Sequence, residues 1–246
     1  MSDWSQIALM LWEIRPRDLW AGIGVTLAFT VLGRLVRGVS YSGAVAGAVI
    51  CFVLFISAGP GAFVALVSVF IVTWVSTRLG YARKQKLGTA QSGEGRTASQ
   101  VLANLSISAA CAAVFALTKN AAFLLATAAA LSEAAADTVS SELGQAGSAK
   151  ARLITSWKLV PAGTDGGVSV PGTLGGIAAA VLVTVVCVGA GMLPLRQTTA
   201  SVMAALLGMI ADSYLGATLE KRNLLNNNGV NLMGTLFAAA GALLLA

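Results

Sequence analysis

The chain has 246 residues, of which 57% are hydrophobic and 11% charged, with a mean hydropathy of +0.81 and a net charge of +6. Soluble domains carry about 25% charged residues, so this composition excludes an ordinary soluble domain and predicts membrane-spanning helices. Histidine is absent, which removes the commonest general base and transition-metal ligand. The three cysteines lie inside apolar runs, which favours a packing role over a disulfide framework or a zinc site.

The first residues are expected to lie at the membrane interface. The apolar stretch 7–12 is too short to span, and neither a cleavable leader nor an Arg-rich transit segment is evident. Trp4, Trp12 and Trp20 suit the headgroup region. We therefore expect residues 1–16 to be interfacial, and we expect the protein in the plasma membrane of a bacterium or archaeon rather than in a plastid.

Apolar runs predict one integral membrane domain over residues 1–246, an all-α polytopic bundle with seven or eight spanning helices. The runs cover residues 19–35, 43–57, 61–78, 99–117, 121–143, 173–193, 199–220 and 230–246. Only Ala58-Gly59-Pro60 separates the second run from the third, as is typical of a tight turn. Ala211-Asp212-Ser213 echoes Ala136-Asp137-Thr138, which suggests an internal duplication. Small residues at 43–47 could pack helices within one chain or between two, as in a homodimer.

The basic residues fall unevenly between the two faces that this topology predicts. The loops after the first, third, fifth and seventh runs carry 12 of the 16 lysines and arginines. The positive-inside rule makes that face cytoplasmic and places both chain ends outside.

Three carboxylates lie within or beside the apolar runs. Glu133 and Asp137 are four residues apart and share one helix face, which Ser141 extends, while Asp212 lies in the seventh run. A carboxylate at membrane depth costs about 2.5–3.5 kcal/mol, so such residues usually face a cavity, a partner or an ion. A pocket between the fifth and seventh helices would suit Mg²⁺. The alternatives are structural ion pairs with Arg96 or Lys158, and a proton or cation relay.

Polar, glycine-containing loops lead into three helices on the basic face. They are residues 93–104, 161–176 and 226–231. Free backbone N–H groups at a helix N-terminus favour anions, and glycine lets the backbone approach a phosphate closely. A Walker-type Gly-Lys-Ser/Thr sequence does not occur. These loops therefore predict a phosphate-binding site without a P-loop.

Five motifs in order resemble the transmembrane protein 19-like family, which includes the phytyl-phosphate kinases of plants and cyanobacteria. They are Gly95-Arg96-Thr97-Ala98-Ser99-Gln100-Val101-Leu102-Ala103-Asn104, Ala136-Asp137-Thr138 with Ser141-Glu142-Leu143-Gly144, Thr164-Asp165-Gly166-Gly167-Val168-Ser169, Asp212-Ser213 with Leu215-Gly216-Ala217, and Asn227-Asn228 with Val230-Asn231. The resemblance covers residues 95–246, the expected catalytic region.

The resemblance implies a membrane kinase that transfers a phosphoryl group from a nucleoside triphosphate, with CTP as the expected donor, to a prenyl monophosphate such as phytyl phosphate. It implies Mg²⁺ as cofactor and no nucleic-acid partner. The expected metal ligands are Asp137, Asp212, Glu133 and Glu142. Phosphate charge would be neutralised by Arg96, Lys158 and Arg152. The remaining substrate- and nucleotide-binding residues are Asn104, Thr138, Ser141, Thr164, Asp165, Gly166, Gly167, Ser169, Asn227, Asn228 and Asn231.

Three other functions are compatible with the sequence. The same site could transfer a cytidylyl group and make a CDP-lipid. Intramembrane carboxylates and glycine-broken segments also fit a lipid or ion transporter, although a transporter should line a path across the membrane with polar groups. A purely structural protein would leave Glu133, Asp137 and Asp212 unexplained.

Overall fold

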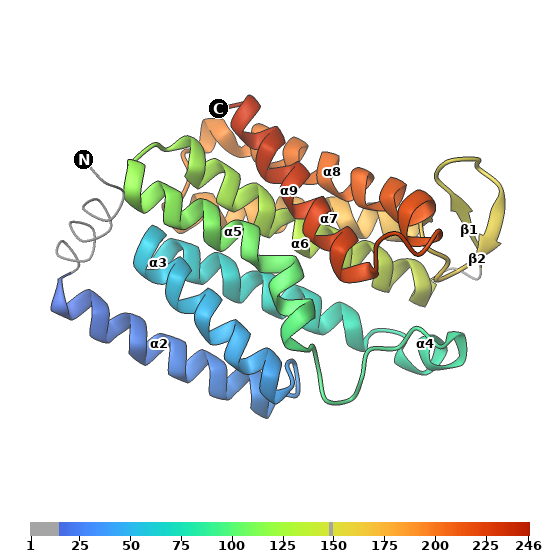
Figure 1. The fold of residues 1–246 in the computed structure, drawn as a ribbon, viewed down its shortest axis with the longest axis horizontal. Coiled ribbons are helices and arrows are strands. Elements are labelled where there is room, and N and C mark those ends of the chain that lie inside the picture. The colour runs from blue at the N-terminus through green and yellow to red at the C-terminus, as the bar shows by residue number, and fades with distance from the viewer. Residues whose placement is uncertain (1–14, 148–149) are drawn as a thin grey trace.

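The computed structural model describes residues 15–147 and 150–246, so residues 1–14 of the expected interfacial segment lie outside the described part. The long helices form one bundle that is elongated along a single axis (Figure 1). They are α2 (Pro16–Leu35), α3 (Tyr41–Arg78), α5 (Ala98–Thr118), α6 (Ala122–Gly147), α7 (Val170–Gly189), α8 (Thr198–Leu215) and α9 (Asn227–Leu244). The prediction of an all-α bundle is confirmed.

Helix α3 consists of two antiparallel limbs joined by a sharp turn. Gly59 has a φ of +78° and ψ of −172°, and Pro60 follows it, so the helix cannot continue through this point. The second limb returns to the start of α3, because Trp74 Nε1 donates a hydrogen bond to the carbonyl of Val36 at 3.1 Å. The two limbs are the predicted second and third helices. Of the described helices, six are long and apolar enough to cross a membrane, with α3 counted once and α9 not included.

The shorter elements are helix α4 (Tyr81–Leu87), the 3₁₀ turn η1 (Leu195–Gln197), the π-helical turn η2 (Gly216–Glu220), and the strands β1 (Lys150–Leu153), β2 (Leu159–Pro161) and β3 (Gly167–Val168). The strands form an antiparallel sheet in the order β2-β1-β3. This sheet was not predicted from the sequence and lies where only a polar loop was expected.

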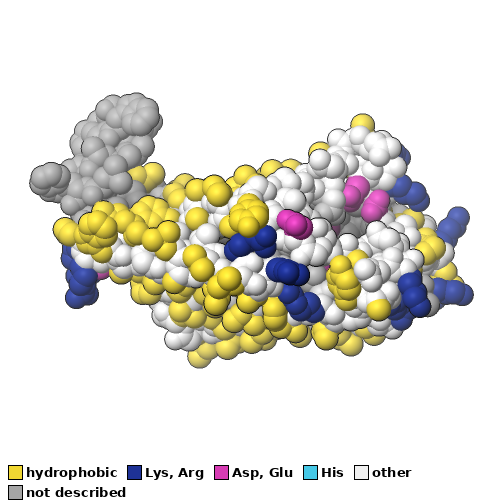
Figure 2. Space-filling model, turned by 90° about the horizontal axis from the view of Figure 1, so that it is seen from below, with side chains coloured by type: hydrophobic (Ala, Val, Ile, Leu, Met, Phe, Trp, Pro, Cys, Tyr) yellow, Lys and Arg dark blue, Asp and Glu magenta, His cyan; other side chains and the backbone are white. Residues whose placement is uncertain are grey.

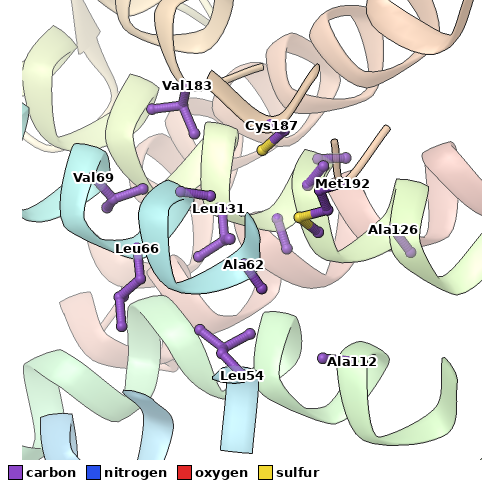
Figure 3. Close-up of a cluster of buried hydrophobic side chains, with 14 of the residues drawn as sticks. Leu54, Ala62, Leu66, Val69, Ala112, Ala126, Leu131, Val183, Cys187 and Met192 are labelled. Carbon is purple, nitrogen blue, oxygen red and sulfur yellow. The ribbon is translucent and has the colours of Figure 1, made fainter. Parts of the chain in front are cut away.

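Helix α6 is the centre of the bundle. Every residue from Leu125 to Ala136 is buried, and α6 packs against α3, α5, α7, α8 and α9. Its many alanines allow this close packing. Figure 3 shows Leu131 of α6 among side chains from α3, α5 and α7 in the apolar core. A buried hydroxyl chain adds polar links, since Thr184 lies 3.0 Å from both Ser132 and Ser201.

The two ends of the bundle differ in composition. Helix α4 and the sheet lie at one end, whereas the start of α2 and the C-terminus lie at the other (Figure 1). Seen from below, hydrophobic side chains cover much of the left and middle of the surface (Figure 2). Basic side chains lie in the middle and on the right, with a further basic group at the left edge (Figure 2).

Candidate active site

A polar cavity of about 140 Å³ lies at the end of the bundle that carries the sheet. It is enclosed by α6, α8, η2, the start of α9 and segment 162–169. Asp137 of α6 and Asp212 of α8 both line it, and their carboxyl groups lie within hydrogen-bonding distance of each other. Two carboxylates this close repel each other unless a proton or a cation lies between them. The structure thus brings together the two aspartates that the sequence singled out.

Glu133 lies one helical turn deeper than Asp137 and is 1% exposed. Two glycines of neighbouring helices make room for it. A Cβ on Gly208 of α8 would come within 2.7 Å of its Cγ, and a Cβ on Gly234 of α9 within 2.6 Å of its Oε1. The same added Cβ on Gly234 would lie 3.4 Å from Oδ2 of Asp212, so both carboxylates face the same point on α9.

Three acceptor oxygens of α6 and α8 are buried without a hydrogen-bond partner. They belong to Glu133, Gln145 and Asp212. Buried oxygens are normally paired, so the unpaired oxygens of Glu133 and Asp212, which face the same point on α9, suit a cation. Gln145 lies twelve residues further along α6 than Glu133, about 18 Å away, and so belongs to the other end of the cavity. The described residues hold no group of three or more His, Cys, Asp or Glu side chains arranged as a preformed metal site. Mg²⁺ commonly takes one or two carboxylates and completes its shell with water and substrate phosphates, which the aspartate pair can accommodate.

Segment 162–169 closes the cavity from the sheet side. Gly166 has a φ of +70°, and a Cβ there would come within 2.4 Å of Ala217 and 2.6 Å of the Ser213 carbonyl. Only glycine therefore allows this loop to lie against α8 and η2. Ser169 then caps α7 by accepting a hydrogen bond from Gly172 N at 3.3 Å. The N-termini of α7 and α9 both border the cavity, which favours bound anions.

Most of the predicted binding residues do line this cavity: Ser141, Thr164, Asp165, Gly166, Gly167, Ser169, Asn227 and Asn231. Four further polar residues line it that were not predicted as site residues: Ser140, Gln145, Ser213 and Glu220. Glu220 ends the π-helical turn η2, and π-helical turns often occur at functional sites. The sequence carries no signal for such a turn.

Arg96 reaches the cavity region from the other side of α6. Its backbone pairs with the α2–α3 connection, since Ser40 N donates to the Arg96 carbonyl at 2.9 Å and Arg96 N donates to Gly38 O at 3.1 Å. Its Nη2 donates to Oγ1 of buried Thr138 at 3.5 Å. Burial lowers the pKa of the Arg96 guanidinium, and the carboxylates of Glu142 and Asp137 oppose that shift. Arginine stays protonated under these conditions, so a fixed positive charge lies near Asp137.

Asn104 takes a similar bridging position. Its side chain donates to the Gln100 carbonyl at 2.9 Å and accepts from Nδ2 of Asn231 at 3.5 Å. Asn104 does not line the aspartate cavity itself, whereas Asn231 does. The two predicted asparagines are therefore joined across α5 and α9.

Eight of the predicted residues do not line this cavity: Glu133, Arg96, Thr138 and Asn104, which lie next to it, and Glu142, Lys158, Arg152 and Asn228. Glu142 instead forms a salt bridge with buried Lys84 and accepts a hydrogen bond from Thr77 Oγ1 at 3.0 Å. Lys158 is exposed in the turn between β1 and β2, and Arg152 donates to the nearby Trp157 carbonyl at 2.9 Å. In the described part of the chain neither aspartate forms a salt bridge with Arg96 or Lys158, which disfavours the structural ion-pair alternative.

Comparison with known proteins gives a family and no solved structure. The model of the family "Integral membrane protein DUF92" matches residues 24–242. The "Uncharacterized membrane protein MJ0933" of Methanocaldococcus jannaschii is 29% identical over 89% of this chain and 90% of its own. "Protein VTE6, chloroplastic" of Arabidopsis thaliana is 28% identical over 92% and 71%, respectively. The "Uncharacterized membrane protein sll0875" of Synechocystis is 31% identical over 78% and 76%.

No solved structure matches the chain. The relatives are archaeal, cyanobacterial and plant proteins, so membership does not itself select one kind of membrane. The family match spans nearly the whole bundle, including both aspartates and every segment that encloses the polar cavity. The chain is a multi-pass integral membrane protein and belongs to the DUF92 family.

Proposed function

We propose that this protein is a membrane phosphotransferase that moves the γ-phosphoryl group of a nucleoside triphosphate to a prenyl monophosphate and forms the prenyl diphosphate. The observation that carries the proposal is the polar cavity in which Asp137 and Asp212 face each other beside unpaired buried oxygens and two helix N-termini. The motif resemblance to phytyl-phosphate kinases supplies the substrate class and CTP as the donor.

Asp137 and Asp212 are the residues that would hold Mg²⁺ in this site, with Glu133 one helical turn deeper. When bound, Mg²⁺ would neutralise and orient the triphosphate oxygens. The protein itself positions the nucleotide. Thr164, Ser169 and Asn227 line the same cavity and present hydroxyl and amide groups to phosphate or ribose oxygens.

The reaction needs no general base. A phosphate monoester is already an anion near neutral pH and can attack the γ-phosphorus directly, so the absence of histidine is no obstacle. Catalysis then depends on positioning and on neutralising charge. Arg96 supplies a fixed positive charge next to Asp137, which would reduce the repulsion between the two approaching phosphates.

The site is proposed to face the cytoplasm. The loops at the sheet end carry most of the basic residues, and the positive-inside rule assigns that end to the side where nucleoside triphosphates are made. Helix α4 and the sheet lie at this end (Figure 1), and strand β3 lines the polar cavity. A one-sided arrangement of polar groups suits an enzyme of lipid substrates better than a transporter.

The test is a phosphoryl-transfer assay on detergent-purified protein with Mg²⁺, geranylgeranyl monophosphate and γ-labelled CTP or ATP. Label should appear in geranylgeranyl diphosphate and depend on Mg²⁺. Label from α-labelled CTP in a lipid product would instead establish cytidylyl transfer. Absence of both from folded protein, over several chain lengths, would refute the enzyme proposal and favour transport.

A further inference from the structure

A second and larger cavity lies beside the first. It has a volume of about 410 Å³ and is enclosed by α2, both limbs of α3, the loop before α5 and the first turns of α5. The polar cavity instead lies among α6, α8 and α9. The bundle therefore holds two separate cavities on the two sides of α6. In the proposed phosphotransferase reaction the nucleotide occupies only the polar one.

The second cavity is polar at one end and apolar at the other. Arg37, Arg78 and Gln100 line it near the helix ends that face the sheet side, whereas Phe29 and Leu66 line its deeper part. The Arg37 guanidinium has no hydrogen-bond or ion-pair partner in the described part of the chain. A cationic mouth above an apolar interior is complementary to an anion that carries a hydrocarbon chain.

The depth of the cavity matches one leaflet. Its lining on the second limb of α3 extends from Arg78 to Leu66. At 1.5 Å per residue this is about 18 Å along the helix. Half of a hydrocarbon core of about 30 Å is about 15 Å. A chain in this cavity would therefore reach from the membrane surface to about the bilayer midplane.

Two residue contacts connect the second cavity to the aspartates. Arg96 lines the second cavity and donates to Thr138, the neighbour of Asp137. Asn104 lines it as well and is hydrogen-bonded to Asn231, which lines the polar cavity. The polar end of the larger space thus meets the wall of the nucleotide site at Arg96 and Asn104.

We propose that the second cavity is the acceptor site for a single-chain lipid monophosphate, whose phosphate binds at Arg96 and whose chain lies among α2, α3 and α5. This inference rests on the proposed phosphotransferase function. An acceptor phosphate oxygen at Arg96 would attack the γ-phosphorus from the side opposite the nucleotide. The new P–O bond forms as the bond from the γ-phosphorus to its bridging oxygen breaks, and the nucleoside diphosphate leaves with that electron pair.

Two glycines provide a matched pair of variants. Gly47 lines the second cavity and Gly24 lines neither cavity, and a Cβ at each position would have no atom within 4 Å. Gly47→Leu should therefore occupy lipid space without forcing a backbone shift, and Gly24→Leu is the control. We expect Gly47→Leu to raise the KM for geranylgeranyl monophosphate by about tenfold or more while the KM for the nucleotide stays within about twofold. Gly24→Leu should change neither KM.

A photoreactive geranylgeranyl monophosphate analogue gives an independent test on the unaltered protein without nucleotide. Crosslinks should map to α2, α3 and α5, and an excess of inorganic phosphate should not abolish them. Crosslinks confined to α6, α8 and α9, or an unchanged lipid KM in folded Gly47→Leu, would overturn the acceptor-site assignment while leaving the phosphotransferase intact. Specific crosslinks in a protein without transfer activity would instead contradict the proposed function.

Discussion

Arg96 and Thr138 meet between the two cavities: Nη2 of the arginine donates a hydrogen bond to Oγ1 of the threonine at 3.5 Å. Thr138 follows Asp137, so this contact places a positive charge beside the aspartate pair without joining it in a salt bridge. The backbone of Arg96 is held by the α2–α3 connection. One residue therefore links the helices of the larger cavity to the acidic centre.

Replacing Arg96 by lysine tests whether this link serves the reaction. Lysine keeps the charge but loses the planar fork that can contact Thr138 and a phosphate together. We expect kcat/KM for phosphoryl transfer to fall by about 100-fold, with normal folding. Arg196→Lys, at the opposite end of the bundle in η1, is the control and should leave the kinetics unchanged. Equal activity of both variants would remove Arg96 from the proposed mechanism.

Asp137→Asn and Asp212→Asn test the acidic pair directly. Each change removes one negative charge from a pair that lies within hydrogen-bonding distance, so each should lower kcat by about 1,000-fold or more and raise the Mg²⁺ concentration needed for half-maximal activity. The double variant should be little worse than either single one, because the two residues act as a unit. Asp18→Asn in the first turn of α2 is the matched control. Full activity of Asp137→Asn would exclude the proposed metal site.

Gly234 and Gly241 provide a steric test within α9. A Cβ on Gly234 would lie 2.6 Å from Oε1 of Glu133, whereas the nearest atom to a Cβ on Gly241 is 3.8 Å away. We expect Gly234→Ala to displace Glu133 and disturb the neighbouring Asp212, with at least a tenfold loss of kcat, and Gly241→Ala to be neutral or slightly stabilising. Transfer assays and thermal unfolding of both variants, measured side by side, check this. Unchanged kcat in Gly234→Ala would show that the position of Glu133 is not critical.

Most of the bundle could be predicted because length and hydropathy determine spanning helices. The turn at Gly59 and Pro60 was predicted for the same reason, since two apolar runs flank a helix-breaking pair. The meeting of Asp137 and Asp212 was also predicted, because an intramembrane carboxylate requires a partner or an ion. The small sheet around Arg152 and Lys158 was not predicted, since its short strands have no clear alternation. Neither residue lines the polar cavity.

The helical spacing of Glu142 argues against its predicted place beside Asp137 as a metal ligand. Glu133, Asp137 and Ser141 follow one another at four-residue intervals and share a face. Glu142 is five residues from Asp137, which turns it by about 140° around the helix. It therefore faces Lys84 of α4, a contact that no local pattern could reveal. The position of Glu220 in the polar cavity could not be predicted either, because it depends on the π-helical turn η2.

Glu142→Gln separates a structural role from a metal-binding one. Lys84 is 0% exposed and is held by Glu142 together with the carbonyls of Ser76 and Thr77. Losing the carboxylate leaves a buried ammonium without its counter-charge, which should lower the free energy of unfolding by roughly 3 kcal/mol, at the lower end for a broken buried pair because Glu142 is partly exposed. Activity per folded molecule and the Mg²⁺ requirement should not change.

The exposed pair Arg15–Asp18 gives the control for that measurement. Its side chains are 73% and 40% exposed, so Asp18→Asn should cost less than about 1 kcal/mol. Thermal unfolding in detergent and Mg²⁺ titration of activity, carried out on both variants, distinguish the two roles. If Glu142→Gln left stability unchanged but raised the Mg²⁺ requirement, Glu142 would belong to the metal site, and its salt bridge with Lys84 would have to open during turnover.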